Sequence, residues 1–151
     1  MEISDKGLAL IIRFEGFRDK AYRDAGGTWT IGFGNTEYSD GRPVREGDTC
    51  TLAQAKESMR YDLRQFGMDV ERLVKRDLKQ NEFDALLSFR YNAGTSYKSG
   101  GRWRLYNIWK YATNGTITKE YWEHLAITSG GRVLKGLIKR RKAEAEMYFN
   151  E

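Results

Sequence analysis

The chain has 151 residues, with 40% hydrophobic and 13% aromatic residues and a formal net charge of +5. This length suits one well-packed core and is short for two, so we expect a single domain over residues 1–151 with no separate binding module. One cysteine excludes an internal disulfide, and one histidine leaves a zinc site built from two or three histidines without ligands. The positive charge favours an anionic partner.

The first predicted helix begins after Ser4, a typical N-cap residue, and ends at Gly16. Its apolar face has the spacing i, i+3, i+4, i+7 and comprises Leu8, Ile11, Ile12 and Glu15. Because its neighbours on this face are apolar, we expect the Glu15 carboxyl to be partly desolvated. Desolvation disfavours the charged form, so Glu15 should hold a proton near neutral pH. The alternative is a terminal glutamate that simply reaches water.

A hairpin with one bare face is predicted next. Residues 21–23 are typical of a strand, and residues 24–27, which begin with Asp24, are typical of a turn. Residues 28–34 then alternate between bulky side chains, which can pack, and a small face that carries Thr30, Gly32 and Gly34. The small face leaves room for a ligand against the backbone. Taken alone, Asp24 would be read as an ordinary Asx-turn residue.

The order Glu15, Asp24 nine positions later and Thr30 six further, within the strand WTIGFG, resembles the active-site motif of phage-type lysozymes, glycoside hydrolase family 24. The stretches QNEFDALLSF, YNAG and GLIKRRKAE extend the resemblance over essentially the whole chain. It implies a mostly helical α+β lysozyme-like fold, with a small β-hairpin lobe and a larger helical lobe around a cleft. One departure is Asn35, where these enzymes often have a histidine that is usually counted as structural. This departure puts a local hydrogen bond in doubt more than the chemistry.

The resemblance implies an endolysin that hydrolyses the β-1,4 bond between N-acetylmuramic acid and N-acetylglucosamine in peptidoglycan, with no cofactor and no metal. Cleavage needs a neutral acid beside the leaving oxygen, a role that we assign to Glu15. Asp24 would stabilise the oxocarbenium-like sugar or direct water onto it, and Thr30 would hold that water. The family leans towards inversion of the anomeric carbon.

Two weaker sets of site residues complete the prediction. Candidates for substrate binding are Gly32, Gly34 and Thr36. In the setting of the family's C-terminal motif, either Arg140 or Arg141 is expected to reach Glu15 and regulate its charge, and the sequence does not say which.

Other functions stay open at this point. A lytic transglycosylase would need only Glu15, and a catalytically silent lysozyme fold would act as a peptidoglycan-binding module. A peptidase using Cys50 and His124 is disfavoured because Cys50 lies in a polar loop. Residues 139–142 are basic, but apolar residues lie near this run at helical spacing, which favours a solvated face over a nucleic-acid site. We therefore expect a monomer that binds a glycan strand, with no nucleic acid and no membrane insertion.

The longest uncharged run near the start, residues 7–12, is too short for a signal-peptide core or a membrane span. We expect synthesis in the cytoplasm without a signal peptide, and the resemblance to phage-type lysozymes implies release to the cell wall through a holin-type pore.

The remaining elements are mainly helical. We expect a loop over residues 36–51 with a strand near 42–45, and a long helix from Thr51 that continues to residue 75. A buried central helix should run from Gln80 to Gly94, followed by a flexible connection over residues 95–101. Three helices should follow, one from Trp103 to residue 114, a short one over residues 119–127 and a last one over residues 136–149. Four side chains are assigned to the core, namely Met59, Met68, Trp103 and Tyr106.

Overall fold

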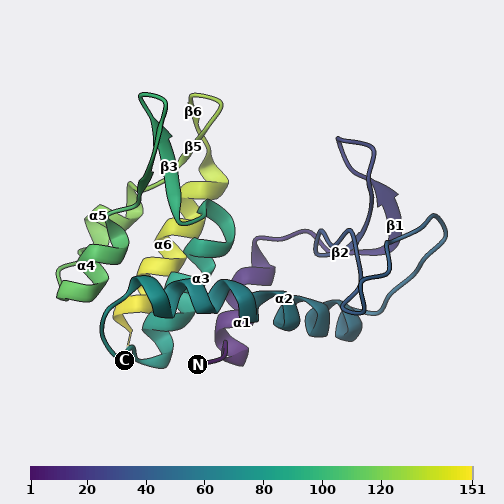
Figure 1. Ribbon diagram of the computed structural model, residues 1–151, viewed down its shortest axis with the longest axis horizontal. Coiled ribbons are helices and arrows are strands. Elements are labelled where there is room, and N and C mark those ends of the chain that lie inside the picture. Colours follow the sequence, from purple (N-terminus) through teal and green to yellow (C-terminus); the bar gives the residue numbers. More distant parts are fainter. Residues whose placement is uncertain (151) are drawn as a thin grey trace.

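The computed structural model describes residues 1–150, which form a larger helical lobe and a small β lobe joined by one long helix (Figure 1). The helices are α1 (Asp5–Arg13), α2 (Leu52–Leu73), α3 (Gln80–Ala93), α4 (Ile108–Asn114), α5 (Lys119–Glu123) and α6 (Lys135–Phe149). The strands are β1 (Arg18–Arg23), β2 (Trp29–Gly32), β3 (Ser96–Ser99), β4 (Arg102–Leu105), β5 (Thr128–Ser129) and β6 (Arg132–Val133). The predicted mostly helical α+β class is confirmed.

Helix α3 is the centre of the larger lobe, as its sequence predicts. Five of its apolar side chains are at most 1% exposed, and they are Phe83, Ala85, Leu86, Leu87 and Phe89. Helices α1, α2 and α6 all pack against it. The Phe89 ring meets those of Trp109 and Trp122 at centroid separations of 5.9 and 6.4 Å. Gly94 ends the helix with φ of +85°, a conformation that glycine adopts without strain.

Helix α1 is fixed to α3 by a buried carboxylate. The Ser4 hydroxyl accepts a hydrogen bond from the Gly7 backbone N–H, as the predicted N-cap should, and itself donates to Asp84. Asp84 is only 2% exposed and also accepts from the Gln80 side chain at 2.8 Å. Because Gly7 has no side chain, α1 can approach this carboxylate closely.

Replacing Gly7 with alanine should therefore destabilise the protein. A Cβ on Gly7 would lie 2.5 Å from Asp84 Cγ, and the hydrogen bonds of Asp84 restrict how far it can move away. We expect a loss of about 1–3 kcal/mol in the free energy of unfolding, measured by urea denaturation. Gly136→Ala is the matched control, since a Cβ there meets nothing within 4 Å inside α6. It should be neutral or stabilising by up to about 1 kcal/mol.

The small lobe is built on the β1–β2 hairpin, in which Tyr22 pairs with Thr30 and Arg23 with Trp29. The chain then turns sharply after Gly32, and Ile31 and Asn35 exchange two backbone hydrogen bonds of 2.9 Å. Strand β2 is thus shorter than the predicted strand over residues 28–34. The strand expected near residues 42–45 is reduced to an isolated bridge between Glu37 and Pro43.

The segment after α3 differs most from the prediction. Residues 95–101 and the start of the helix expected at Trp103 instead form the β3–β4 hairpin, in which Lys98 pairs with Trp103. Gly100 and Gly101 both have positive φ, which is what a two-residue hairpin turn requires. As a result Trp103, expected in the core, is 71% exposed. Met68 is also 71% exposed, whereas Met59 is buried as predicted.

The chain beyond α4 is also shorter in helix than predicted. Helix α5 ends at Glu123 instead of residue 127, and the glycine pair 130–131 lies in the turn of a second small hairpin, β5–β6. Trp122 faces inward with no exposed surface, as expected. Within residues 1–150, no helix combines the length and the apolar character needed to cross a membrane.

Candidate active site

Glu15 lies just after α1, at the start of the segment that leads into the small lobe. The helix ends at Arg13, two residues earlier than the spacing predicts, and the Glu15 backbone N–H donates to the Ile12 carbonyl at 3.2 Å. The Glu15 side chain is 24% exposed. Its Oε1 accepts a hydrogen bond of 2.8 Å from Arg140 Nη1. Of the two arginines left open by the sequence, Arg140 is therefore the partner of Glu15.

Arg140 belongs to a buried charged network between α3 and α6. Its Nε donates to Glu144 at 3.3 Å, and its Nη2 donates to the Ser88 carbonyl at 3.2 Å. Arg141 points elsewhere, pairing with the other Glu144 oxygen at 2.5 Å and with Asn92. The side chains of Arg140, Arg141 and Glu144 are at most 3% exposed. The solvated face predicted for residues 139–142 is thus wrong for both arginines, because Glu144 one turn later lets them be buried.

The charges of this network depend on Glu15. Arg140 and Arg141 bring two positive charges into the interior, and Glu144 supplies one negative charge. The carboxylate of Glu15 supplies the second. The surroundings of Glu15, expected from the sequence to be apolar, therefore also include a guanidinium.

Asp24 lies in the turn between β1 and β2 and is exposed, as predicted. Its Oδ1 accepts hydrogen bonds of 2.9 Å from the backbone N–H groups of Gly26 and Thr28. These contacts are those of an Asx turn, and they also fix the direction of the carboxylate. No hydrogen bond to Oδ2 occurs within the described residues, so this oxygen is open to water or a ligand.

Thr30 lies on β2 in the same hairpin, but it is only 3% exposed and not on an open face. Its hydroxyl donates to the Thr28 carbonyl at 2.9 Å. With its proton used in this way, the Thr30 oxygen can still accept a hydrogen bond. Asp24 and Thr30 are thus held together by one hairpin, whereas Glu15 lies at the end of α1 on the larger lobe (Figure 1).

The three weaker candidates lie in or beside the turn after β2. Gly32 is buried, and a Cβ there would meet Ala55 of α2 at 3.3 Å, which indicates a role in bringing β2 close to α2. Gly34 and Thr36 are exposed, and the Thr36 carbonyl accepts from Val44 at 3.0 Å. Substrate binding by these residues stays a prediction.

The structure adds Asp62 and Tyr91, two polar residues that sequence reasoning passes over. Asn35, the departure noted in the sequence, donates from Nδ2 to Asp62 Oδ2 of α2 at 2.7 Å and so links the turn to the long helix. Burial raises the pKa of Asp62, and the charge of Glu37 adds to this effect. Burial, with the charges of Glu15 and Asp62, raises the pKa of Tyr91 to about 12, so its hydroxyl stays neutral beside these carboxylates.

The raised pKa of Asp62 predicts a stability that falls with pH. A carboxyl whose pKa is higher in the folded state favours folding while protonated and costs free energy once ionised. Asp62→Asn should therefore gain stability relative to the wild type at pH 7 but not at pH 3. We expect about 0.5 kcal/mol after allowance for solvent screening, measured by urea denaturation at both pH values. Glu37→Gln should shift stability in the same direction by less, and an equal gain at both pH values would contradict the argument.

A pocket of about 790 Å³ lies elsewhere, between the loop after β2 and the outer face of α2. Neither Glu15, Asp24 nor Thr30 lines it. Several of its polar side chains already pair with one another, such as Arg42 with Asp40 and Tyr38 with Asp48. We therefore place the candidate site at Glu15 and the β1–β2 hairpin. Within residues 1–150, no group of three or more His, Cys, Asp or Glu side chains could hold a metal ion.

Comparison with known proteins relates the whole chain to one family. Residues 12–144 match the family model described as phage lysozyme. The endolysin of Acyrthosiphon pisum secondary endosymbiont phage 1 is 34% identical over 149 residues, which cover 98% of each chain. A crystal structure of a P22 lysozyme mutant aligns over 98% of both chains with 28% identity and a TM-score of 0.81. The muramidase domain of SpmX from Asticaccaulis excentricus aligns over 99% of both chains with 29% identity and a TM-score of 0.78. Several endolysins of Bacillus and Lactococcus phages are longer, and the chain spans 54–60% of their length.

Proposed function

We propose a specific reaction for this chain from the premise that it belongs to the phage lysozyme family, a family of glycoside hydrolases that degrade the cell wall. The reaction is hydrolysis of the β-1,4 bond between N-acetylmuramic acid and N-acetylglucosamine in peptidoglycan, with inversion, which leads to bacterial lysis. The observation that carries most weight is the pairing of Glu15, a carboxyl that reaches solvent, with the buried guanidinium of Arg140.

Glu15 is proposed as the general acid. The glycosidic oxygen is a poor leaving group and must gain a proton as the bond breaks. Arg140 touches one of the two Glu15 oxygens, Oε1, which leaves Oε2 to carry the proton towards the substrate. We assign Arg140 the role of orienting this carboxyl.

Asp24 and Thr30 are proposed to direct the attacking water. Asp24 Oδ2 is free, and the Thr30 oxygen can accept one more hydrogen bond. A water molecule that donates one proton to each would turn a lone pair towards the anomeric carbon. This supports direct attack by water from the face opposite the acid, the arrangement of inverting glycosidases. The ionised Asp24 would also stabilise the positive charge that develops on the sugar.

The test is product analysis with purified peptidoglycan. We expect new reducing ends on N-acetylmuramic acid, detected by mass spectrometry, with the inverted α-anomer formed first in NMR spectra. Anhydro ends would identify a lytic transglycosylase instead, and an initial β-anomer would identify a retaining reaction. Binding to peptidoglycan without any new ends would identify the silent binding module.

The route to the cell wall and the monomeric state stay predictions. If release requires a holin-type pore, bacteria that express the chain alone should stay intact. Lysis should follow within minutes once the inner membrane is permeabilised. Sedimentation equilibrium of the purified chain tests the monomer.

A further inference from the structure

Two hairpins of the larger lobe have the same tip sequence. The tetrapeptide Ser-Gly-Gly-Arg occurs at residues 99–102 in the β3–β4 hairpin and at residues 129–132 in the β5–β6 hairpin. In both, the serine pairs with the arginine across the turn. The glycines have φ of +58° and +76° in the first tip, and +58° and +78° in the second. Two separate segments thus present an arginine on the same rigid turn.

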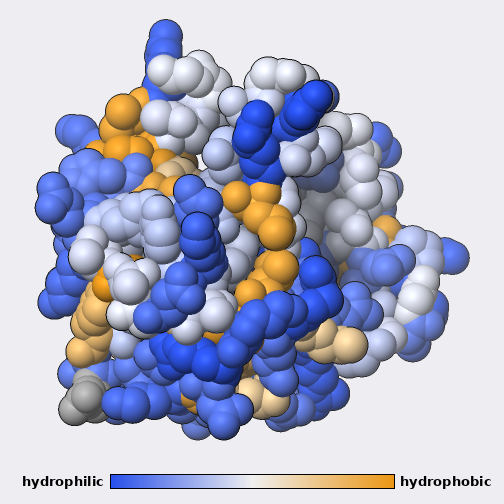
Figure 2. Space-filling view, turned by 60° about the vertical axis from the view of Figure 1, so that its left-hand side comes forward, coloured by the Kyte–Doolittle hydropathy of each residue, from blue (hydrophilic) through white to orange (hydrophobic). Residues whose placement is uncertain are grey.

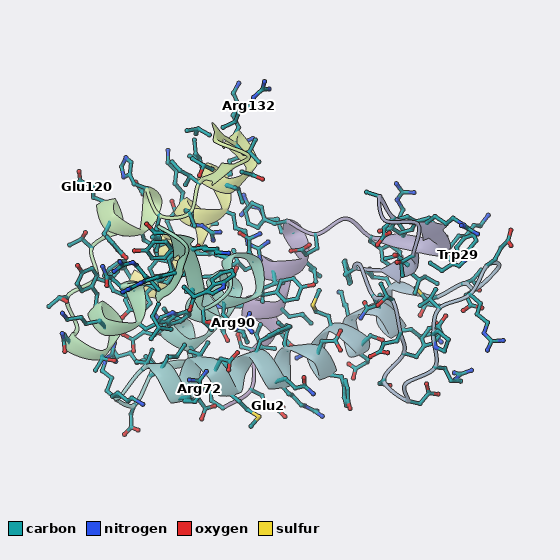
Figure 3. The ribbon with its side chains drawn as sticks, turned by 45° about the horizontal axis from the view of Figure 1, so that its top comes forward. Glu2, Trp29, Arg72, Arg90, Glu120 and Arg132 are labelled. Carbon is teal, nitrogen blue, oxygen red and sulfur yellow. The ribbon has the colours of Figure 1, made fainter. Side chains whose placement is uncertain are left out.

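Both hairpins lie at the same end of the helix pair formed by α3 and α6. Helices α3 and α6 are antiparallel, because Asn81 near the start of α3 bonds to Tyr148 near the end of α6, while Asn92 bonds to Arg141. The β3–β4 hairpin begins at residue 96, directly after α3 ends. The β5–β6 hairpin ends at residue 133, directly before α6 begins. Both project from the top of the larger lobe in Figure 1, and Arg132 points away from the body of the protein in Figure 3.

This end of the helix pair is also the end that holds Glu15. Arg140, which binds Glu15, lies one to two helical turns after the β5–β6 hairpin, and Ser88, which contacts Arg140, lies two turns before the β3–β4 hairpin. A polymer bound at Glu15 would therefore lie within reach of both tips.

The hairpins carry an unbalanced positive charge. Residues 96–105 and 128–135 contain five basic residues and no acidic one, whereas the rest of the chain has 21 basic and 21 acidic residues. Arg102 and Arg132 are exposed, and neither forms an ion pair within residues 1–150. Each is followed by an exposed apolar side chain, Trp103 at 71% and Val133 at 59%. Figure 2 shows hydrophilic side chains on the projections at the upper edge of the molecule.

We infer that Arg102 and Arg132 form a two-pronged binding site for the carboxylates of the peptide stems that branch from the glycan strand. This inference rests on the proposed function, which places that strand beside Glu15. A guanidinium binds a carboxylate through two parallel N–H donors, a geometry suited to peptide carboxylates. The peptides repeat along the strand, so two arginines on separate rigid tips can engage two of them at once, which raises affinity more than either contact alone.

The test measures binding to insoluble peptidoglycan freed of teichoic acid, by sedimentation, with all variants made in a Glu15→Gln background so that no substrate is consumed. The double variant R102Q/R132Q should bind about tenfold more weakly. On the same peptidoglycan after its stem carboxylates have been converted to amides, the double variant and its parent should bind equally. R102K/R132K, which keeps the charge but loses the paired donors, should fall between them.

The matched control is K110Q/K119Q, which removes the same charge from two exposed lysines of the same lobe outside the hairpins. It should change binding less than twofold. An equal loss of binding in this control would overturn the inference, because general charge attraction would then explain the binding. Unchanged binding by R102Q/R132Q would also overturn it, because the two arginines would then serve another ligand, such as the phosphate of teichoic acid. Binding is measured without turnover, so its outcome does not depend on the proposed reaction. Failure of that reaction is detected in a separate experiment, as an absence of new reducing ends when the wild-type protein acts on peptidoglycan.

Discussion

Glu15→Gln is expected to reduce the rate of peptidoglycan cleavage by about 10²–10⁴-fold, the usual contribution of a general acid. The amide keeps the shape of the side chain and can still accept the hydrogen bond from Arg140, but it cannot give up a proton to the leaving oxygen. Binding to peptidoglycan should remain. The measurement is release of reducing ends by wild type and variant under identical conditions, with sedimentation of both proteins on the same peptidoglycan.

Two controls make this result specific. Glu2→Gln changes another glutamate near the start of the chain, one that pairs with Arg64 on the surface, and should leave the rate within twofold. Asp24→Asn should also slow cleavage, because Asp24 is proposed to direct water, while its Oδ1 contacts survive in the amide. A Glu15→Gln protein that cleaves as fast as the wild type would move the acid to another residue.

Glu144→Ala is expected to cost about 3–5 kcal/mol in the free energy of unfolding, because it leaves buried guanidinium groups without this partner. Glu144 has no exposed side-chain surface and accepts hydrogen bonds from Arg140, Arg141, Ser88 and Trp122. Without it, two guanidinium groups stay buried with one remaining carboxylate between them. The loss would fall on an arginine that is already incompletely paired, because the buried Nε of Arg141 has no hydrogen-bond partner among the described residues.

Urea denaturation followed by circular dichroism measures this cost. Glu146→Ala, an exposed glutamate two residues further along α6, should change stability by no more than about 0.5 kcal/mol. If Glu144→Ala does not fold, Glu144→Gln tests the same point, because the amide oxygen can still accept while the negative charge is gone. A Glu144→Gln protein as stable as the wild type would show that the charge of Glu144 contributes little.

The features predicted correctly from sequence are those with local causes. The cap at Ser4 depends on a hydrogen bond to a residue three positions away, and it forms as the sequence indicates. The burial of α3 follows from apolar side chains on nearly all sides of one helix. Asp24 could be placed in its turn because an aspartate before two glycines has few other structures available.

The features that could not be predicted depend on contacts between distant segments. Arg140 and Arg141 are adjacent, so only the packing of α6 on α3 decides which of them faces Glu15. Tyr91 and Asp62 belong to no motif, and Tyr91 feels the charges of both Glu15 and Asp62 only because distant segments pack together. The β3–β4 hairpin replaces a predicted connection and the start of a predicted helix, and Trp103, predicted for the core, does not pack inward.

The ion pair between Glu15 and Arg140 joins residues 125 positions apart. A ribosome makes the chain from its N-terminus, so the whole motif from Glu15 to Thr30 emerges long before its buried partner exists. Until α6 has been synthesised and has packed on α3, Glu15 is an ordinary carboxylate at the end of a short helix, without the guanidinium that orients it. An incomplete chain therefore carries the residues of the reaction without their arrangement, and the competent site is among the last parts of the protein to form.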